Sequence, residues 1–446
     1  MRRLIYIFII GLLLCSYTWA DGSRYASKSL LSEGKWVKIR VDKTGIYKLS
    51  YADLKNMGFS DPSKVSVHGY GGWPLDEDFS KEYIDDVPST PVWRGSDYLL
   101  FYGKGPVKWE YDSSSQTFVH TNNPYSLYGY YFVTDATPTN DMTSVAQASG
   151  ATNRITTYDD YLVHEQELVS LAKSGRELYG EDFSGATPRT LSTFSSIPGI
   201  TNEDAKVTMS FVSKVTSGTG VASLSINQSN VLDVSIRSNR EEYVKALEGV
   251  STAVWKGEKS EKNSVVVSYN SASHNNVRLN YVRLHFKRTL QPYGAYTFFR
   301  SIASIGNVSR FVVQGANANT LVFDVTDAQR VRLMETELNG SELTFSIPAG
   351  TLREFVLVRT DQSFISPEVV GEVENQNLHA LEQKDMIIIA AKAFQTQAER
   401  LAEEHRATDG LTVEVVDPQS IYNEFSSGAP DATAYRRFPP PPPAGS

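Results

Sequence analysis

Apolar and charged residues alternate along residues 35–41, which is the period-two pattern of a half-buried β-strand. A turn-like sequence follows at 42–45. Residues 46–49 then predict a second strand that returns beside the first as a hairpin, with Gly45 in the positive-φ region of the turn.

A short helix is predicted directly after these strands. Ser50 and Asp53 have the spacing of a capping box, in which each side chain accepts from the backbone of the other. Gly58 is suited to close the helix at its C-terminal end.

Most of the remaining chain also predicts β-structure. Aromatic and β-branched runs separated by turn residues have the spacing of sandwich strands. They occur at 65–67, 98–102, 128–134, 207–212, 221–226, 265–269, 277–286, 311–313, 321–325, 343–347 and 355–358. We therefore expect a mixed, mainly β domain at 21–140 and a β-sandwich-like region, of one or two domains, at 155–370.

The pattern changes near residue 376. A continuous apolar run at 386–390 predicts a strand buried on both faces, 394–405 has helical spacing, and 411–416 predicts a second buried strand. Strand, helix and strand together predict a βαβ unit, the opening of a parallel sheet. Asp431 is suited to cap a further helix.

The expected fold is therefore mainly β, with two or more β-sandwich-like domains, followed by the truncated start of an α/β domain at 376–438. Two parallel strands cannot bury themselves, so this last domain is expected to be incomplete. Residues 439–446 are Pro-rich and are interpreted as a non-native tail. A genuine polyproline tail is the alternative.

The N-terminus has the layout of a secretory signal peptide over residues 1–20. Two arginines precede an apolar run at 4–14, and Ala20 precedes the expected cleavage site. Export to the cell surface, outer membrane or periplasm is therefore expected, with an N-terminal membrane anchor as the alternative reading.

Composition excludes several functions. Cys15 is the only cysteine, so cleavage after Ala20 would leave no thiol for a nucleophile or a zinc–thiolate site. The net charge is −8 and no basic stripe occurs, which argues against nucleic acid as a partner.

The standard catalytic motifs are absent from the sequence. The glycines at 69–72 lack the spacing of a phosphate-binding loop and predict a turn. His164 and Glu165 lack the second histidine of a zinc helix, so a solvated segment is expected there. His405 is expected to pack on the apolar side of its helix.

Acidic and aromatic clusters give two weaker leads. Acidic residues gather at 76–78, 85–86 and 159–160, where solvated loops are the simpler reading and calcium binding the alternative. Aromatic residues at 98–102 and 125–132 are expected in the core, with a glycan-binding face as the alternative.

Several longer stretches resemble the PorU-type sortases of the type IX secretion system, a gingipain-like cysteine peptidase family of Bacteroidota. The similar stretches are 36–49, 97–106, 123–126, 378–382, 385–389, 417–418, 421–428 and 430–434. The later ones resemble the entry to the peptidase domain.

The resemblance implies the N-terminal part of an enzyme that removes C-terminal signals from secreted cargo and attaches the cargo to surface lipopolysaccharide. It implies cargo proteins and other secretion components as partners, with lipopolysaccharide as a further candidate. The family's catalytic histidine and cysteine match no position here. We therefore predict no catalytic, cofactor-binding or metal-binding residues, no cofactor, and no activity for this chain alone.

Two other functions remain open at this stage. The chain could be a non-enzymatic surface protein whose β domains bind glycan or protein, or a secreted hydrolase with a serine or metal site in its β region. The βαβ unit argues against the first, and the missing motifs argue against the second.

Overall fold

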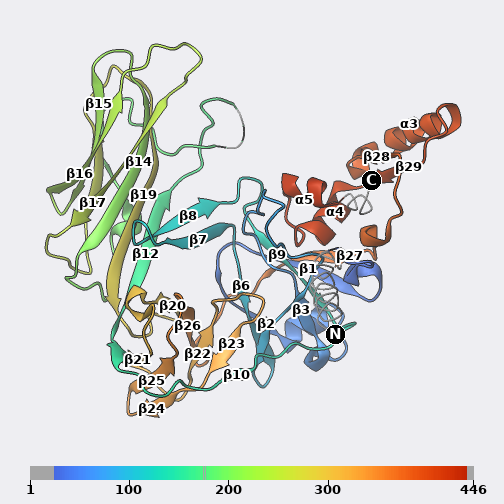
Figure 1. Ribbon diagram of the computed structural model, residues 1–446, viewed down its shortest axis with the longest axis horizontal. Helices are drawn as coiled ribbons and strands as arrows, with labels where there is room; N and C mark the ends of the chain where they lie inside the picture. Colours follow the sequence, from blue (N-terminus) through green and yellow to red (C-terminus); the bar gives the residue numbers. More distant parts are fainter. Residues whose placement is uncertain (1–24, 174, 176, 439–446) are drawn as a thin grey trace, which may run out of the picture. The chain divides into compact units, whose positions relative to one another are not determined.

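The computed structural model describes residues 25–173, 175 and 177–438 (Figure 1). The chain divides into two compact units, each described here by itself. The first unit spans 1–107, 125–141 and 366–446, and the second spans 108–124 and 142–365. The expected signal peptide and the Pro-rich tail lie outside the described residues.

Both units are discontinuous in sequence, whereas the expected domains are continuous. The hairpin of β7 (Val107–Asp112) and β8 (Thr117–Asn122) groups with the second unit, and the segment from 366 onward groups with the first. The limits expected from sequence therefore stay a prediction.

A five-stranded antiparallel sheet forms the centre of the first unit. The strand β1 lies between two partners that are distant in sequence, so it is covered on both edges. The strand order is β27 (Glu368–Val373), β1 (Trp36–Val41), β9 (Gly129–Thr134), β3 (Ser66–His68) and β4 (Ser89–Thr90).

The second sheet of this unit corrects the hairpin prediction. The strand β2 (Gly45–Ser50) does not pair with β1 but with β6 (Tyr98–Gly103), which in turn pairs with β5 (Val92–Arg94). Gly45 is extended and faces Gly103, so it does not take a positive φ. Partners from distant segments outcompete the local turn here.

The helix α2 (Tyr51–Asn56) confirms the predicted capping box, because Ser50 accepts from the backbone of Asp53 and the Asp53 side chain accepts in return. The described part of the first unit also has four short 3₁₀ turns: η1 (Leu30–Ser32), η2 (Pro62–Lys64), η5 (Leu378–Ala380) and η6 (Lys392–Phe394).

The predicted βαβ unit is present. Strands β28 (Met386–Ile389) and β29 (Val413–Val416) are parallel neighbours, joined by α3 (Gln395–Thr408). Two helices follow, α4 (Pro418–Phe425) and α5 (Ala432–Arg437), and Asp431 caps the second as expected by accepting from the amide of Thr433.

The burial expected for these strands is wrong in part. No residue of β28 is fully buried, and Ile389 is 41% exposed. The apolar residues Phe394 and Leu401 of the connecting segment are also exposed, because among the described residues β28 and β29 have only each other as strand neighbours.

The second unit is built from sheets. Its largest has nine strands in the order β10 (Ser144–Val145), β23 (Arg332–Met334), β22 (Thr320–Asp324), β26 (Glu354–Arg359), β20 (Tyr296–Arg300), β12 (Thr157–Glu165), β19 (Asn275–Thr289), β14 (Ala205–Lys214) and β17 (Leu247–Trp255). Turn η3 (Ser192–Phe194) precedes its strand β14, and turn η4 (Ile302–Ser304) follows its strand β20.

Two four-stranded sheets accompany the large one. One has the order β13 (Arg189–Thr190), β18 (Val265–Tyr269), β15 (Thr219–Ile226) and β16 (Ser229–Arg237); the other has the order β11 (Asn153–Ile155), β21 (Ser309–Val313), β25 (Glu342–Ile347) and β24 (Glu337–Asn339). Each shares a hydrophobic core with part of the large sheet, which is the sandwich-like arrangement expected from the strand spacing. Within the described residues, no helix has the length and apolar content needed to cross a bilayer.

Candidate functional site

A buried ionic cluster joins the turn η5 and the helix α4 to the loop that precedes β4 in the first unit. His379 of η5 and Glu424 of α4 have fully buried side chains, and His379 Nδ1 lies 2.5 Å from Glu424 Oε2. The other ring nitrogen, Nε2, lies 3.1 Å from Asp85 Oδ1. Carboxylates on both sides favour an imidazolium that donates from both nitrogens.

The charge state of this histidine follows from its surroundings. Burial alone would disfavour the charged ring, but the hydrogen bonds to Asp85 and Glu424 and their negative charges outweigh it. Together they raise the pKa of His379 to about 9. A ring that donates both protons has no lone pair available to act as a general base, so the cluster holds the segment in place.

The carboxylate of Glu424 also binds the backbone that leads into the peptidase-like segment. It accepts from the amides of Leu378 and His379 at 2.8 and 3.1 Å, and from Gln376 Nε2 at 2.8 Å. The Glu424 carboxylate therefore holds residues 376–379, which follow β27. Several hydrogen bonds to one carboxylate are what stabilises a buried charge.

A second attachment is made by a buried lysine. Lys38 of β1 is 5% exposed, and its Nζ donates to Asn423 Oδ1 at 3.0 Å and to the Gly428 carbonyl at 2.7 Å. The ammonium group lies 4.6 Å from the ring centroid of Tyr130. Burial lowers the pKa of Lys38 to about 7.

The loop after α4 approaches the β-strands closely. Ser427 Oγ accepts from the Tyr70 amide at 2.9 Å and donates to the Tyr130 carbonyl at 3.0 Å. A Cβ on Gly69 would lie 2.6 Å from Ser427 Oγ, and Gly69 has a φ of +113°. The glycines at 69–72 lie in an irregular segment after β3, where the sequence predicts a turn, and Gly69 allows this close contact.

The structure corrects the solvated-loop prediction for two of the three acidic clusters, those at 85–86 and 159–160. Asp86 is buried, and it accepts from Ser29 Oγ and the Leu30 amide, while its neighbour Asp85 accepts from the Ala26 amide and from His379. These two carboxylates can lie away from bulk water because backbone amides, a hydroxyl group and an imidazole supply their hydrogen bonds.

The loop prediction is also wrong for the acidic pair at 159–160, because both residues lie in β12. Asp159 is buried and accepts from His285, Lys287 and the Ile302 amide. Asp160 is half-buried and pairs with Arg288. The residues at 76–78 do lie on a largely exposed loop.

The segment around His164 is likewise a strand and not a solvated stretch. His164 of β12 is buried between Thr193 Oγ1 at 2.8 Å and Glu181 Oε1 at 2.6 Å, and Glu165 accepts from His120. His405 lies in α3, half-buried, beside Asp409. Within the described ranges, no group of three or more His, Cys, Asp or Glu side chains is placed to hold a metal ion.

The aromatic run at 98–102 packs mainly in the core, because Leu99, Leu100 and Phe101 are fully buried. In the run at 125–132, Tyr131 and Phe132 are buried, while Tyr125 is partly exposed.

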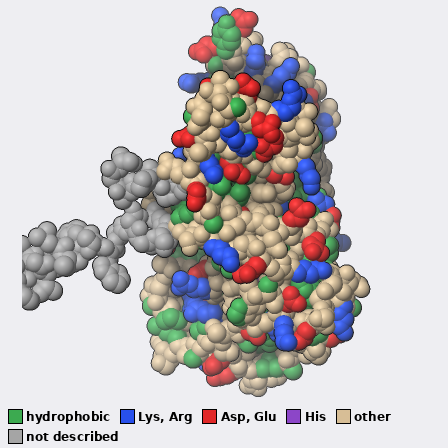
Figure 2. Space-filling view, turned by 90° about the vertical axis from the view of Figure 1, so that its right-hand side faces the viewer, with side chains coloured by type: hydrophobic (Ala, Val, Ile, Leu, Met, Phe, Trp, Pro, Cys, Tyr) green, Lys and Arg blue, Asp and Glu red, His purple; other side chains and the backbone are tan. Residues whose placement is uncertain are grey.

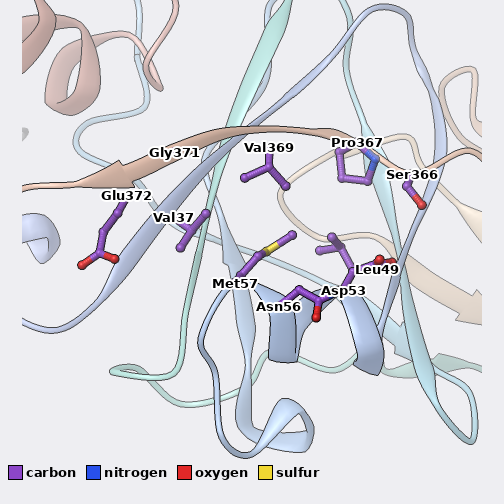
Figure 3. A pocket seen from close by; sticks show the side chains of 10 residues that line it. All are labelled: Val37, Leu49, Asp53, Asn56, Met57, Ser366, Pro367, Val369, Gly371 and Glu372. Carbon is purple, nitrogen blue, oxygen red and sulfur yellow. The ribbon is translucent and has the colours of Figure 1, made fainter.

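A cavity of about 410 Å³ lies in the first unit between α2 and the edge strand β27 (Figure 3). Met57 and Val369 point toward each other across it, with Leu49 at its base. Asp53 lines it too, but this carboxylate is used in the capping box. The cavity therefore offers apolar contact and no group arranged for chemistry.

Comparisons with known proteins agree with the position of the ionic cluster. The model of Peptidase family C25 matches residues 379–439, which begin at His379. No curated protein matches the chain.

One solved structure is similar over nearly the whole chain. This is dimeric latent PorU from Porphyromonas gingivalis, with 34% sequence identity and a TM-score of 0.87 over 93% of this chain. The present chain spans 40% of that protein's length.

Two further solved structures show only a weak similarity. CBM35 of Cellvibrio japonicus Abf62 has 12% identity and a TM-score of 0.18 over 32% of this chain and 94% of its own. BuGH86 in complex with neoagarooctaose has 11% identity and a TM-score of 0.17 over 57% of this chain and 33% of its own. The sequence, the fold and the match at residues 379–439 agree on one family, and the chain belongs to the PorU-type, gingipain-like proteins.

Proposed function

We propose that this chain supplies the N-terminal β-structure and the first βαβ unit of a type IX secretion sortase. The observation that carries the proposal is the similarity to PorU, with 34% identity over 93% of the chain, together with the Peptidase family C25 match at 379–439. The complete enzyme would cleave C-terminal signals from secreted cargo and transfer the cargo to surface lipopolysaccharide.

Within that enzyme, the first unit would hold the beginning of the peptidase domain. Two buried contacts support this role, one between His379 and Asp85 and one between Lys38 and Asn423. Both connect β-strands or loops of the N-terminal sequence with the segment that matches the peptidase family. A catalytic site further along the chain needs rigid support, and these buried contacts would fix the first residues of its domain.

The partners and location follow the same proposal. Cargo proteins and secretion components would be the partners, and the chain would be exported to the cell surface, outer membrane or periplasm. Figure 2 shows basic and acidic side chains interspersed over one face of the molecule. Such a mixed surface suits protein partners, whereas nucleic acid binding needs a continuous basic stripe.

The first test is to read the genomic sequence beyond the codon for Phe438. We expect an open frame encoding an α/β domain that contains a cysteine and a histidine, since the chemistry needs a thiolate beside an imidazole. A stop codon directly after residue 446 would instead favour a non-enzymatic surface protein.

The second test measures activity of the complete reading frame. Purified protein is incubated with a cargo that carries its C-terminal signal, and cleavage is followed by mass spectrometry. Alanine in place of the encoded cysteine is the control and should abolish cleavage. Equal cleavage by both proteins, or by the present chain alone, would contradict the proposal.

A further inference from the structure

A second cavity, of about 390 Å³, lies in the second unit at one end of the large sheet. Three arginines line it: Arg330 from the loop between β22 and β23, Arg332 from β23, and Arg353 from the residue before β26. Three guanidinium groups therefore surround one cavity, although the chain has a net charge of −8.

A buried carboxylate positions two of these arginines. Asp324, at the end of β22, is 2% exposed, and its Oδ2 accepts from Nη2 of both Arg332 and Arg353. Its other oxygen, Oδ1, accepts from the Thr326 amide at 3.2 Å and from Thr326 Oγ1 at 2.6 Å. Asp324 therefore has no acceptor position left for a further cation.

The two arginines, by contrast, keep unused donors. Each guanidinium carries five N–H groups, and each gives one nitrogen, Nη2, to Asp324. Among the residues that the structure describes, no other hydrogen-bond acceptor contacts these two side chains. A shared carboxylate thus anchors both guanidinium groups, and each keeps further N–H donors in side chains that line the cavity.

The third arginine adds an adaptable charge at the rim. Arg330 is 84% exposed and pairs loosely with Asp327, at 3.5 Å between Nε and Oδ2. With Asp324 and Asp327 as the acidic groups, three arginines leave the cavity one net positive charge. Planar guanidinium groups match the oxygens of phosphate and carboxylate in a bidentate manner.

We propose that this cavity binds an oxyanion of the phosphate class, either free phosphate or the phosphate group of an ester such as a sugar phosphate. The anion would accept from Arg330, Arg332 and Arg353, with the hydroxyl of Thr351, which also lines the cavity, as a further donor. Asp324 would act as a positioning residue that does not touch the ligand. The proposal is independent of the sortase function.

The test uses the chain as it stands, at pH 7 and constant ionic strength set with chloride, because added salt alone screens charges. Inorganic phosphate and glucose 1-phosphate are titrated separately by isothermal calorimetry. We expect saturable binding of at least one. Affinity should fall at least tenfold in the double variant Arg330→Ala/Arg332→Gln, which removes two of the three charges, one exposed and one half-buried.

A matched control removes an exposed guanidinium of the same unit outside the cavity. Arg154→Ala takes away a side chain that is 61% exposed, and it should leave the affinity unchanged. Tighter binding of the sugar phosphate than of inorganic phosphate identifies an ester as the ligand, and the reverse identifies free phosphate. The proposal fails if neither probe saturates, or if the double variant and Arg154→Ala bind as the unaltered chain does.

Discussion

The contact between His379 and its two carboxylates has a predictable energetic weight. Replacing His379 with alanine leaves Glu424 and Asp85 without their shared cation, and removing one partner of a buried ion pair costs about 3–5 kcal/mol. His405→Ala is the matched control. His405 is half-buried and pairs with Asp409 at the surface, so its removal should change stability by less than about 1 kcal/mol.

Stability of the first unit alone can be followed with a unique thiol. Residues 21–446 contain no cysteine, so Ala434→Cys introduces one thiol at a fully buried position of α5. The rate of its labelling at increasing urea reports opening of this unit. Equal labelling of the His379→Ala and His405→Ala proteins would contradict the assigned role.

The pH dependence combines two opposing effects. The pKa of His379 is raised above its ordinary 6.5 to about 9, so its stabilisation is complete below pH 6.5 and is lost as the pH rises through 9. The pKa of Lys38 is lowered from 10.5 to about 7, so the unfolded chain binds more protons above pH 7 and stability rises with pH.

Between pH 7 and 9 each effect amounts to about 2 kcal/mol, with opposite signs. From pH 7 to pH 9 we expect the free energy of unfolding to stay nearly constant in the unaltered unit. Over the same range it should fall by about 2 kcal/mol in Lys38→Met and rise by a similar amount in His379→Gln. Thiol labelling at residue 434, corrected for the thiol's own ionisation, measures all three. Parallel profiles for the two variants would show that the pKa shifts are misassigned.

The residues of the ionic cluster show why the site could not be found in the sequence. Asp85 and Asp86 have the same local appearance as the exposed acidic residues at 76–78. Their burial depends on His379 and on the amides of Ala26 and Leu30, which lie up to 294 positions away. Sequence spacing carries no signal for such pairs.

At the scale of elements, local rules succeeded where the interaction is local. The capping box of Ser50 and Asp53 and the βαβ order of residues 386–416 were both predictable, because their partners lie within a few residues or within one βαβ unit. The prediction of a hairpin after β1 was wrong because both edges of β1 pair with distant strands, β27 and β9.

The capping box gives a prediction for α2. Ser50→Ala removes the side chain that accepts from the Asp53 amide, at a cost of about 1 kcal/mol. Hydrogen exchange at residues 51–57 should then be about fivefold faster, as measured by mass spectrometry. Ser80→Ala, which alters an exposed loop serine bonded to Asp78, should leave those rates unchanged.

At the scale of the whole molecule, the segment after β27 has two parts of different burial. The helix α3 is largely exposed, including Arg400, whereas residues 421–438 are mostly buried against the rest of the first unit. We expect trypsin to cut first between residues 384 and 406, since proteolysis requires locally accessible backbone.

The fragment that contains α4 and α5 should stay bound after this cut and co-elute with the rest of the chain in gel filtration. Lys38, Glu424 and Ser427 supply the buried contacts that retain it. In the double variant Lys38→Met/His379→Ala the fragment should separate. Release of the fragment from the unaltered chain would show that these contacts are too weak to hold it.

The pairing of β1 with β27 has a consequence for biogenesis. Trp36 lies opposite Val373, so one edge of β1 stays open until more than three hundred further residues have been synthesised. Such distant pairing slows folding, and an open strand edge invites wrong partners. The first five-stranded sheet therefore cannot be completed until residue 373 has been synthesised, so β1 depends on a late segment of the chain to cover its edge.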